Sequence, residues 1–161
     1  VAERLAAFEP LRCLSIYEFS EATRQLSLVA RARPGHPSDG TITRTRCPPD
    51  AAAAFELWCA QPALLPRAVL VSQLPAIALR LESDAPDTLY GSLRSPHGII
   101  GAFALEPRRG SHFDEATRTL LARLRDPFST ALENNHRLRT LGEQAKHAEQ
   151  EKEGLLAKLG R

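Results

Sequence analysis

The side chains best suited to metal chemistry in this sequence are its histidines, which are His36, His97, His112, His136 and His147. No two of them form an HExxH motif or an i, i+4 pair, the spacings that place two ligands on one side of a helix. We therefore expect solvated histidines. The alternative is a metal site that the fold assembles from His97, His112 and a carboxylate such as Asp114.

Thiol chemistry would depend on Cys13, Cys47 and Cys59. Their number is odd, their spacing is wide and no CxxC pair is present, which argues against a disulfide framework. We expect reduced, buried or half-buried thiols, with a redox or metal role as the alternative. The sequence also lacks a nucleophile elbow, a paired-carboxylate motif and a catalytic Cys–His arrangement, so we expect no enzymatic activity.

Composition points to an ordinary globular domain, with 43% hydrophobic and 25% charged residues among 161. The arginines are scattered and the formal net charge is only +2, which does not indicate direct binding of nucleic acid. No apolar run approaches the ~20 residues of a membrane span. We expect a cytoplasmic protein that does not bind membranes. Because the sequence starts at Val1 and contains no methionine, we also expect a piece of a longer protein.

The first third of the chain has the pattern of paired strands. Residues 11–19 and 25–32 alternate apolar and polar side chains and are joined by a short polar connection, which predicts antiparallel neighbours. Residues 1–8 before them fit the end of a helix that stops before Pro10. Residues 41–46 suit a short edge strand with outward charges.

The rest of the globular part predicts further strands between helices. Residues 51–60 form an alanine-rich helix with Asp50 placed as its N-cap. Residues 67–72 predict a short strand, and residues 77–83 fit either a helical turn or further strand. Residues 88–94 and 99–106 predict a hairpin across a four-residue turn. This order indicates an α+β fold: an antiparallel sheet of about five or six strands with helices on one face.

Residues 113–159 have the pattern of one long helix, which Asp114 caps and Pro127 kinks. An apolar stripe that should pack against the sheet comprises Leu120, Leu121, Leu124, Phe128, Ala131 and Leu132. A narrower a/d seam follows at Leu138, Leu141, Ala145, Ala148, Lys152, Leu155 and Leu159. We divide the chain into a sensory domain, residues 1–132, and a coiled-coil-like linker, residues 133–161. We expect a homodimer through this helix; the alternative is a solvated linker.

Several stretches carry a family resemblance. Residues 11–32 look like an opening hairpin, and residues 88–94 with 98–105 are similar to a closing hairpin that contains a "G-x-L-x-L" strand. Phe113-Asp114-Glu115 followed by Leu120-Leu121 is similar to an "F-[ST]-x-E … LL" helix start. Residues 126–134, DPFSTALEN, resemble an "EPFAIALEN" segment, and residues 155–161 look like a run that leads into an ATPase module. Together they resemble a GAF domain, most closely the sensory GAF domains of bacterial sigma-54-dependent transcriptional activators.

The resemblance implies a regulatory domain that binds an unknown small-molecule effector or a partner. It also implies a signal that passes along the last helix to a downstream ATPase module, since no GxxxxGK occurs in this sequence. It places a ligand pocket near Phe55, Trp58, Cys59, Val69, Val71, Ile77, Leu79, Tyr90 and Ser92. The signalling and dimer residues would be Leu124, Phe128, Leu132, Leu138, Leu141, Leu155 and Leu159. No cofactor is identified.

Alternatives remain open for both the pocket and the function. The pocket residues could simply fill the core of a ligand-free dimerisation module. Some GAF sensors bind iron and some relatives reduce methionine sulfoxide with three cysteines, but the cysteines here are placed differently. The cyclic-nucleotide signature is not visible, and a bilin attachment would have only Cys59 as a remote candidate.

Overall fold

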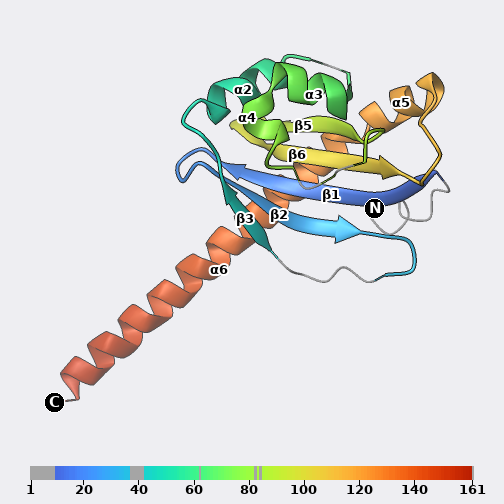
Figure 1. Ribbon diagram of the computed structural model, residues 1–161. Coiled ribbons are helices and arrows are strands. Elements are labelled where there is room, and N and C mark those ends of the chain that lie inside the picture. Colours follow the sequence, from blue (N-terminus) through green and yellow to red (C-terminus); the bar gives the residue numbers. More distant parts are fainter. Residues whose placement is uncertain (1–9, 37–41, 62, 82, 84, 161) are drawn as a thin grey trace.

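The computed structural model describes residues 10–36, 42–61, 63–81, 83 and 85–160, so the helix predicted at residues 1–8 lies outside the described residues. A six-stranded antiparallel sheet, in the order β3-β2-β1-β6-β5-β4, is the centre of the fold (Figure 1). Its strands are β1 Leu11–Ser20, β2 Gln25–Ala32, β3 Thr43–Arg46, β4 Leu65–Pro66, β5 Leu89–Ser95 and β6 Gly98–Pro107. The predicted α+β class, the first hairpin and the last hairpin are confirmed.

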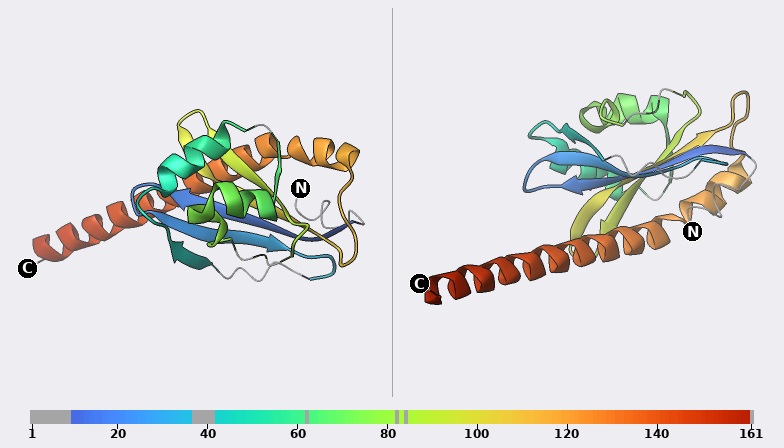
Figure 2. Two further views of the ribbon diagram at one scale, coloured as in Figure 1. Left: turned by 45° about the horizontal axis from the view of Figure 1, so that its top comes forward. Right: turned by 90° about the horizontal axis from the view of Figure 1, so that it is seen from below.

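Helices cover both faces of this sheet (Figure 2). Helices α2 Ala51–Cys59, α3 Arg67–Gln73 and α4 Pro75–Ala78 lie on one face; α5 Glu115–Ala122 and the start of α6 Arg125–Leu159 lie on the other. The predicted α+β sheet with helices packed on one face and a separate long C-terminal helix is confirmed, and the long helix with α5 covers the opposite face. The physical reason is visible in β6, where Ala102 and Ala104 face one layer while Phe103 and Leu105 face the other, so both faces are apolar and both need cover.

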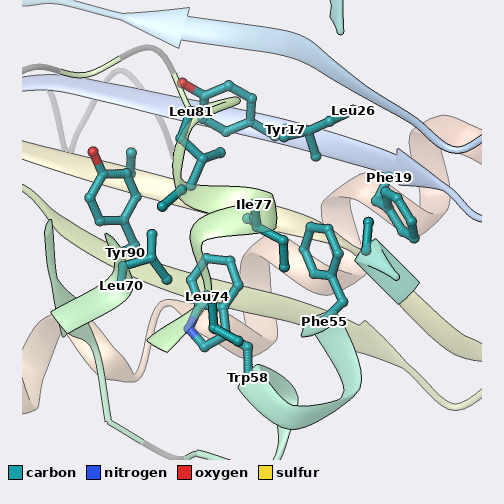
Figure 3. Packing of buried hydrophobic residues seen from close by; sticks show 14 of the residues in the cluster. Tyr17, Phe19, Leu26, Phe55, Trp58, Leu70, Leu74, Ile77, Leu81 and Tyr90 are labelled. Atoms are coloured by element: carbon teal, nitrogen blue, oxygen red, sulfur yellow. The ribbon is translucent and has the colours of Figure 1, made fainter. Parts of the chain in front are cut away.

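Each face has its own hydrophobic core. The α2–α4 side gathers large buried side chains, namely Tyr17, Phe19, Leu26, Phe55, Trp58, Leu70, Leu74, Ile77, Leu81 and Tyr90 (Figure 3). The α5–α6 side buries Leu14, Leu89, Leu93, Phe103, Leu105, Phe113, Leu121, Phe128 and Leu132. The apolar stripe predicted to pack on the sheet is thus confirmed for Leu121, Phe128 and Leu132, and Leu124 packs against them half-buried. The prediction is wrong for Leu120 and Ala131, which are exposed.

One segment in the middle of the chain differs from the sequence prediction. Residues 67–72, predicted as a strand, are the helix α3, which buries Leu70 against the sheet. The strand at this place is β4, two residues long, and Pro66 at its end has the extended backbone of a helix N-cap. Asp50 occupies the N-cap position of α2 as predicted, but its side chain makes no capping hydrogen bond. Of the two options for residues 77–83, the helical turn is present as α4 and the turn after it.

The predicted single helix over residues 113–159 is broken into α5 and α6 at Arg123 and Leu124. Proline has no N–H, so Pro127 cannot donate to the carbonyl of Arg123, and its ring crowds that carbonyl. The chain instead closes α5 with short-range bonds, from Arg123 N to Leu120 O at 3.1 Å and from Leu124 N to Leu121 O at 3.0 Å. The prediction of a mere kink is corrected to a break just before the proline.

Asp114 caps α5 as predicted. Its carboxylate accepts a hydrogen bond from Thr117 N at 2.7 Å, which satisfies one of the free donors in the first turn. Hydrogen bonding by Thr117 lowers the pKa of the Asp114 carboxyl, since this bonding favours the charged form. The cap fixes where α5 starts and therefore how α5 and α6 follow the sheet.

Candidate functional site

The residues predicted to surround a ligand are divided between the core and the surface. Phe55, Trp58 and Tyr90 are fully buried in the α2–α4 core, where the rings of Phe55 and Trp58 stack with centroids 5.8 Å apart (Figure 3). Ile77 and Ser92 are also buried, and Val69 and Cys59 are half-buried. Val71 and Leu79 are 37% and 70% exposed. The structure thus brings the aromatic members together, packed against one another, and leaves Val71 and Leu79 in solvent.

Tyr90 and Trp58, two large side chains of this core that each carry a polar atom, differ in whether that atom has a hydrogen-bond partner. The Tyr90 hydroxyl donates to the carbonyl of Ser83 at 3.2 Å and accepts from Arg67 at 3.4 Å. The Arg67 guanidinium donates to the same Ser83 carbonyl. Trp58 Nε1, in contrast, is buried and has no hydrogen-bond partner among the described residues. A buried donor of this kind costs about 1–3 kcal/mol unless a water or a ligand accepts from it.

A separate hollow lies on the same face, at the end of the sheet where β1 begins and β2 and β6 end. It encloses about 510 Å³. We call it the arginine hollow, after its lining residues Arg12, Arg31, Arg33, Arg108 and Arg109. The rest of its lining is Cys13, Ser15, Ser83, Ala85, Pro86, Asp87, Glu106, Pro107, Gly110 and Ser111.

Pairing across the strands explains how this hollow forms. Ser15 stands opposite Arg31 in the β1–β2 ladder, and Cys13 stands opposite Glu106 in the β1–β6 ladder. Directly opposed residues of antiparallel strands point to the same face, so arginines far apart in sequence meet there. Ser83, Ala85, Pro86 and Asp87, which lie between α4 and β5, supply the other wall.

The arginine hollow is not evident from the sequence, because its arginines are scattered along the chain. One signal could have found it. Residues 11–19 and 25–32 were expected to pair antiparallel, which places the start of one strand, with Arg12, beside the end of the other, with Arg31 and Arg33. The basic loop at residues 107–111 follows a third strand, whose place beside the first could not be derived from its own sequence.

The first turns of α6 are fastened to the opposite face of the sheet by packing and by charge. Phe128 is buried and meets Phe103 of β6 edge-on, with ring centroids 5.2 Å apart. Arg139 donates to Glu18 Oε1 of β1 at 2.5 Å, and His136 Nδ1 lies 3.7 Å from the same oxygen. The Glu18 side chain is only 15% exposed, and its hydrogen bond raises the pKa of Arg139.

A groove of about 730 Å³ runs along this face between α6 and the β1–β2 hairpin. Glu18, Glu133, His136 and Arg139 belong to its lining, as do the apolar side chains of Val29, Ile42 and Ile100. Beyond Thr140 the helix leaves the domain, and residues 141–160 are exposed throughout (Figure 1). The sheet thus holds only the first part of α6.

Comparison with known proteins supports the fold. No family model matches this sequence, and no curated protein matches it. Among solved structures, the GAF domain of phosphoenolpyruvate-protein phosphotransferase from Acinetobacter matches with a TM-score of 0.51 and 16% identity, over 81% of this chain and 75% of that chain. A GAF domain/HD domain protein from Geobacter sulfurreducens matches with a TM-score of 0.46 and 17% identity, over 81% and 84%. The chain has the GAF fold.

In this domain the predicted signalling residues fall into two groups. Phe128 and Leu132 are 3% and 5% exposed and Leu124 is half-buried, so these three residues hold the helix to its own domain. The other group consists of the exposed leucines Leu138, Leu141, Leu155 and Leu159. Only this second group is free to pack on something outside the domain. The described helices include none with the length and apolar character of a membrane span.

The three cysteines are free, and Cys13 and Cys47 are buried while Cys59 is half-buried. Burial raises the pKa of both the Cys47 and the Cys59 thiol, because a thiolate is poorly solvated there. No group of three or more histidine, cysteine or acidic side chains gathers as a metal site among the described residues. The burial of the thiols weakens the redox alternative.

Thiol reactivity should follow from this burial. Since raised pKa values lower the thiolate fraction at pH 8, we expect Cys47 and Cys59 to react with a disulfide reagent at least ~10-fold more slowly in the folded protein than in guanidinium. Spectrophotometric thiol titration with and without denaturant measures both rates. A fast thiol in the folded state would revive the redox alternative.

Proposed function

We propose that this chain is the regulatory GAF domain of a sigma-54-dependent transcriptional regulator. It senses a small effector or a partner in the cytoplasm, has no enzymatic activity of its own and binds neither nucleic acid nor membrane directly. Its signal passes along α6 to an ATPase module. The resemblance of residues 126–134 and of the carboxyl-terminal run to these activators supports the subfamily, and the GAF fold supports the sensory role.

The observation that carries this proposal is the exposed part of α6. Residues 141–159 are exposed and do not pack on the sheet, yet they continue as regular helix for roughly 28 Å. An isolated helix of this length is marginal in water. Gly142 and Gly154 weaken it further, by about 1 kcal/mol each relative to alanine. Such a helix is stable when its apolar seam is paired, so we propose a homodimer in which two copies of α6 form a short coiled coil.

The same geometry provides a means of signalling. Leu132 and the Glu18–Arg139 pair fasten α6 to the sheet, and the seam from Leu138 onward continues directly from them. An effector that binds two packings of this junction with different affinity would change the register or spacing of the paired helices. That change is what an attached ATPase would detect.

Two neighbouring leucines test the coiled coil. Leu155 and Leu156 are 61% and 59% exposed, but only Leu155 lies on the a/d seam. We expect Leu155→Ala to weaken dimerisation at least ~10-fold, because the seam loses a packed side chain from each helix. Leu156→Ala is the matched control and should leave the dimerisation constant within about twofold.

Sedimentation equilibrium over a range of protein concentrations gives these constants. In a longer chain that carries the ATPase module, the same pair of variants tests the output, since only Leu155→Ala should reduce the effect of the effector on ATP hydrolysis. Equal behaviour of the two variants would rule out the proposed seam.

A second candidate function is a dimerisation module without a ligand. The filled aromatic core favours it, because Phe55, Trp58 and Tyr90 occupy the space where the resemblance implies an effector. The two functions differ in one measurable property: a sensory domain is stabilised by its effector, and a simple dimerisation module is not.

A further inference from the structure

We propose that Lys152 and Glu151 determine how two α6 helices pair. Lys152 of each copy contacts the partner's Glu151, and this contact holds the two helices parallel and in register. The inference rests on the homodimer under the proposed function and names the orientation and register of its two copies. Residues 141–160, which carry both side chains, are exposed throughout and therefore accessible to a second copy.

Lys152 is the one charged residue of the apolar seam. With Leu138 and Leu141 at positions a and d, Lys152 is at a further a position, between Ala148 and Leu155. A lysine at a single a position costs stability but selects register and helix number. Within one copy, Lys152 forms no ion pair with another described residue. When two helices pair, its charge partly leaves water, so a carboxylate on the facing helix would stabilise it.

A parallel, in-register pair supplies that carboxylate. A side chain at position a then enters a hole formed by four residues of the facing helix, among them the equivalent a residue and the g residue just before it. For Lys152 these are the partner's Lys152 and the partner's Glu151. The lysine stem packs on the seam while its ammonium group turns outward. Each ammonium thus turns away from the other and toward a carboxylate, and symmetry gives two such contacts.

Other parallel registers offer no carboxylate at this place. The g residues beside the seam are Gln144, Glu151 and Lys158, one heptad apart. Sliding the helices by one heptad would place Lys152 beside the partner's Gln144 or the partner's Lys158. The first is uncharged and the second repels a lysine. Only the in-register pair places each Lys152 beside an acidic g residue.

The competing arrangement is an antiparallel pair. When the whole seam overlaps in that direction, Ala145 stands opposite the partner's Ala148, and Lys152 stands opposite the partner's Leu141. None of the e and g residues nearest to Leu141 is acidic; they are Arg137, Gly142 and Gln144. The ammonium group of Lys152 would then face a leucine and gain nothing from charge. The charges therefore favour the parallel pair.

Glu151 has one contact inside its own helix. His147 Nε2, one helical turn earlier, lies 3.4 Å from Glu151 Oε1. A carboxylate has two oxygens and accepts several hydrogen bonds, so this contact leaves room for an ammonium group of the partner. The Glu151 side chain is 68% exposed in a single copy, so a facing helix can reach it.

A charge exchange between the two positions tests the contact. Lys152→Glu alone and Glu151→Lys alone each place like charges together in the parallel pair, so we expect each to weaken dimerisation about 10-fold. The Glu151→Lys/Lys152→Glu double variant restores the attraction, and its dimerisation constant should lie within about threefold of the wild type. Sedimentation equilibrium of the whole chain gives these constants.

The matched control moves the new lysine to the outer side of the helix. Glu153 follows Lys152 along the chain but lies at position b, off the seam. Glu153→Lys/Lys152→Glu has the same composition and net charge as the exchanged variant, yet it should stay about 10-fold weaker than the wild type. Recovery in both double variants, or in neither, would overturn the proposed contact.

Disulfide formation reports the direction of pairing independently. Leu155→Cys places two cysteines in one layer of a parallel pair, so oxidised glutathione should convert most of the dimer into a covalent one. In the antiparallel pair, residue 155 faces the partner's Leu138, far from the second cysteine. The wild type, whose own cysteines are buried or half-buried, is the control and should stay non-covalent.

Failure of this inference can be told apart from failure of the proposed homodimer. A wild-type chain that is monomeric at every concentration would overturn both. A wild-type dimer whose Leu155→Cys variant forms no covalent dimer, at a concentration where light scattering shows two subunits, would overturn the parallel pairing alone. The paired α6 helices would then stand, with the opposite orientation.

Discussion

Replacing Gly101 with alanine should lower the free energy of unfolding by about 3 kcal/mol or more. A Cβ at this position would lie 1.9 Å from the carbonyl oxygen of Tyr17 and 3.2 Å from Cα of Glu18. Both atoms belong to the backbone of β1, which pairs with β6 in the middle of the sheet. The clash cannot be relieved by turning a side chain, so the two central strands would have to separate.

Gly142→Ala is the matched control for this substitution. Gly142 lies in α6, and a Cβ there would meet no atom within 4 Å. Because alanine favours helix over glycine, this variant should be unchanged or up to about 1 kcal/mol more stable. Guanidinium unfolding followed by circular dichroism measures both variants. A Gly101→Ala protein with the midpoint of the wild type would contradict the register of β1 and β6.

Replacing Phe128 with alanine should cost about 3–5 kcal/mol, the range for deletion of a large buried side chain. Phe128 is 3% exposed and contacts Phe103 edge-on from the first turn of α6. Its loss would leave a cavity between α6 and β6, next to Ser129, whose hydroxyl accepts from Arg94 N at 3.3 Å. We therefore expect the start of α6 to loosen from the sheet as stability falls.

Leu120→Ala provides the comparison, since Leu120 lies on α5 near the same face but is 56% exposed. Its replacement should change stability by less than about 0.5 kcal/mol. Both variants are measured by the same guanidinium titration. If the two variants had similar unfolding midpoints, Phe128 would not be the anchor that the structure indicates.

The sequence predicted those elements whose pattern is long and regular. β1 and β2 alternate over eight residues or more, and the last hairpin has turn chemistry between two apolar runs, so their existence and pairing were predictable. Residues 67–72 are too short for periodicity to separate strand from helix, and Val69 and Val71 favoured the wrong choice. Pro66, which fits the start of a helix, was the better signal.

The coverage of the sheet was harder to predict. Side chains along β6 alternate in size, with alanines on one face and larger side chains on the other. Both sets are apolar, so the pattern does not tell which face is covered by helices. Which helices cover each face depends on connections that a single sequence does not reveal. A disturbance of the helix at Pro127 was predictable, since proline removes a backbone donor. The prediction was a kink, whereas the structure has a full break between α5 and α6.

The two candidate sites also differ in how far the sequence predicts them. The aromatic cluster of Phe55, Trp58 and Tyr90 was found because these side chains are large and their elements were recognised. Its role in binding an effector stays a prediction. The arginine hollow could not be predicted because its five arginines are spread over almost 100 residues and are brought together by strand register. Register is a tertiary property, and a charge count along the chain does not contain it.

The most direct test of the account is amide hydrogen exchange along α6 at two protein concentrations. The central claim is that residues 141–159 are held as helix by a second copy of the chain. We predict slow exchange in this segment at high concentration and faster exchange on dilution, while residues 125–140 stay protected at both. Equally fast exchange of residues 141–159 at every concentration would contradict the paired helix and, with it, the proposed route of signalling.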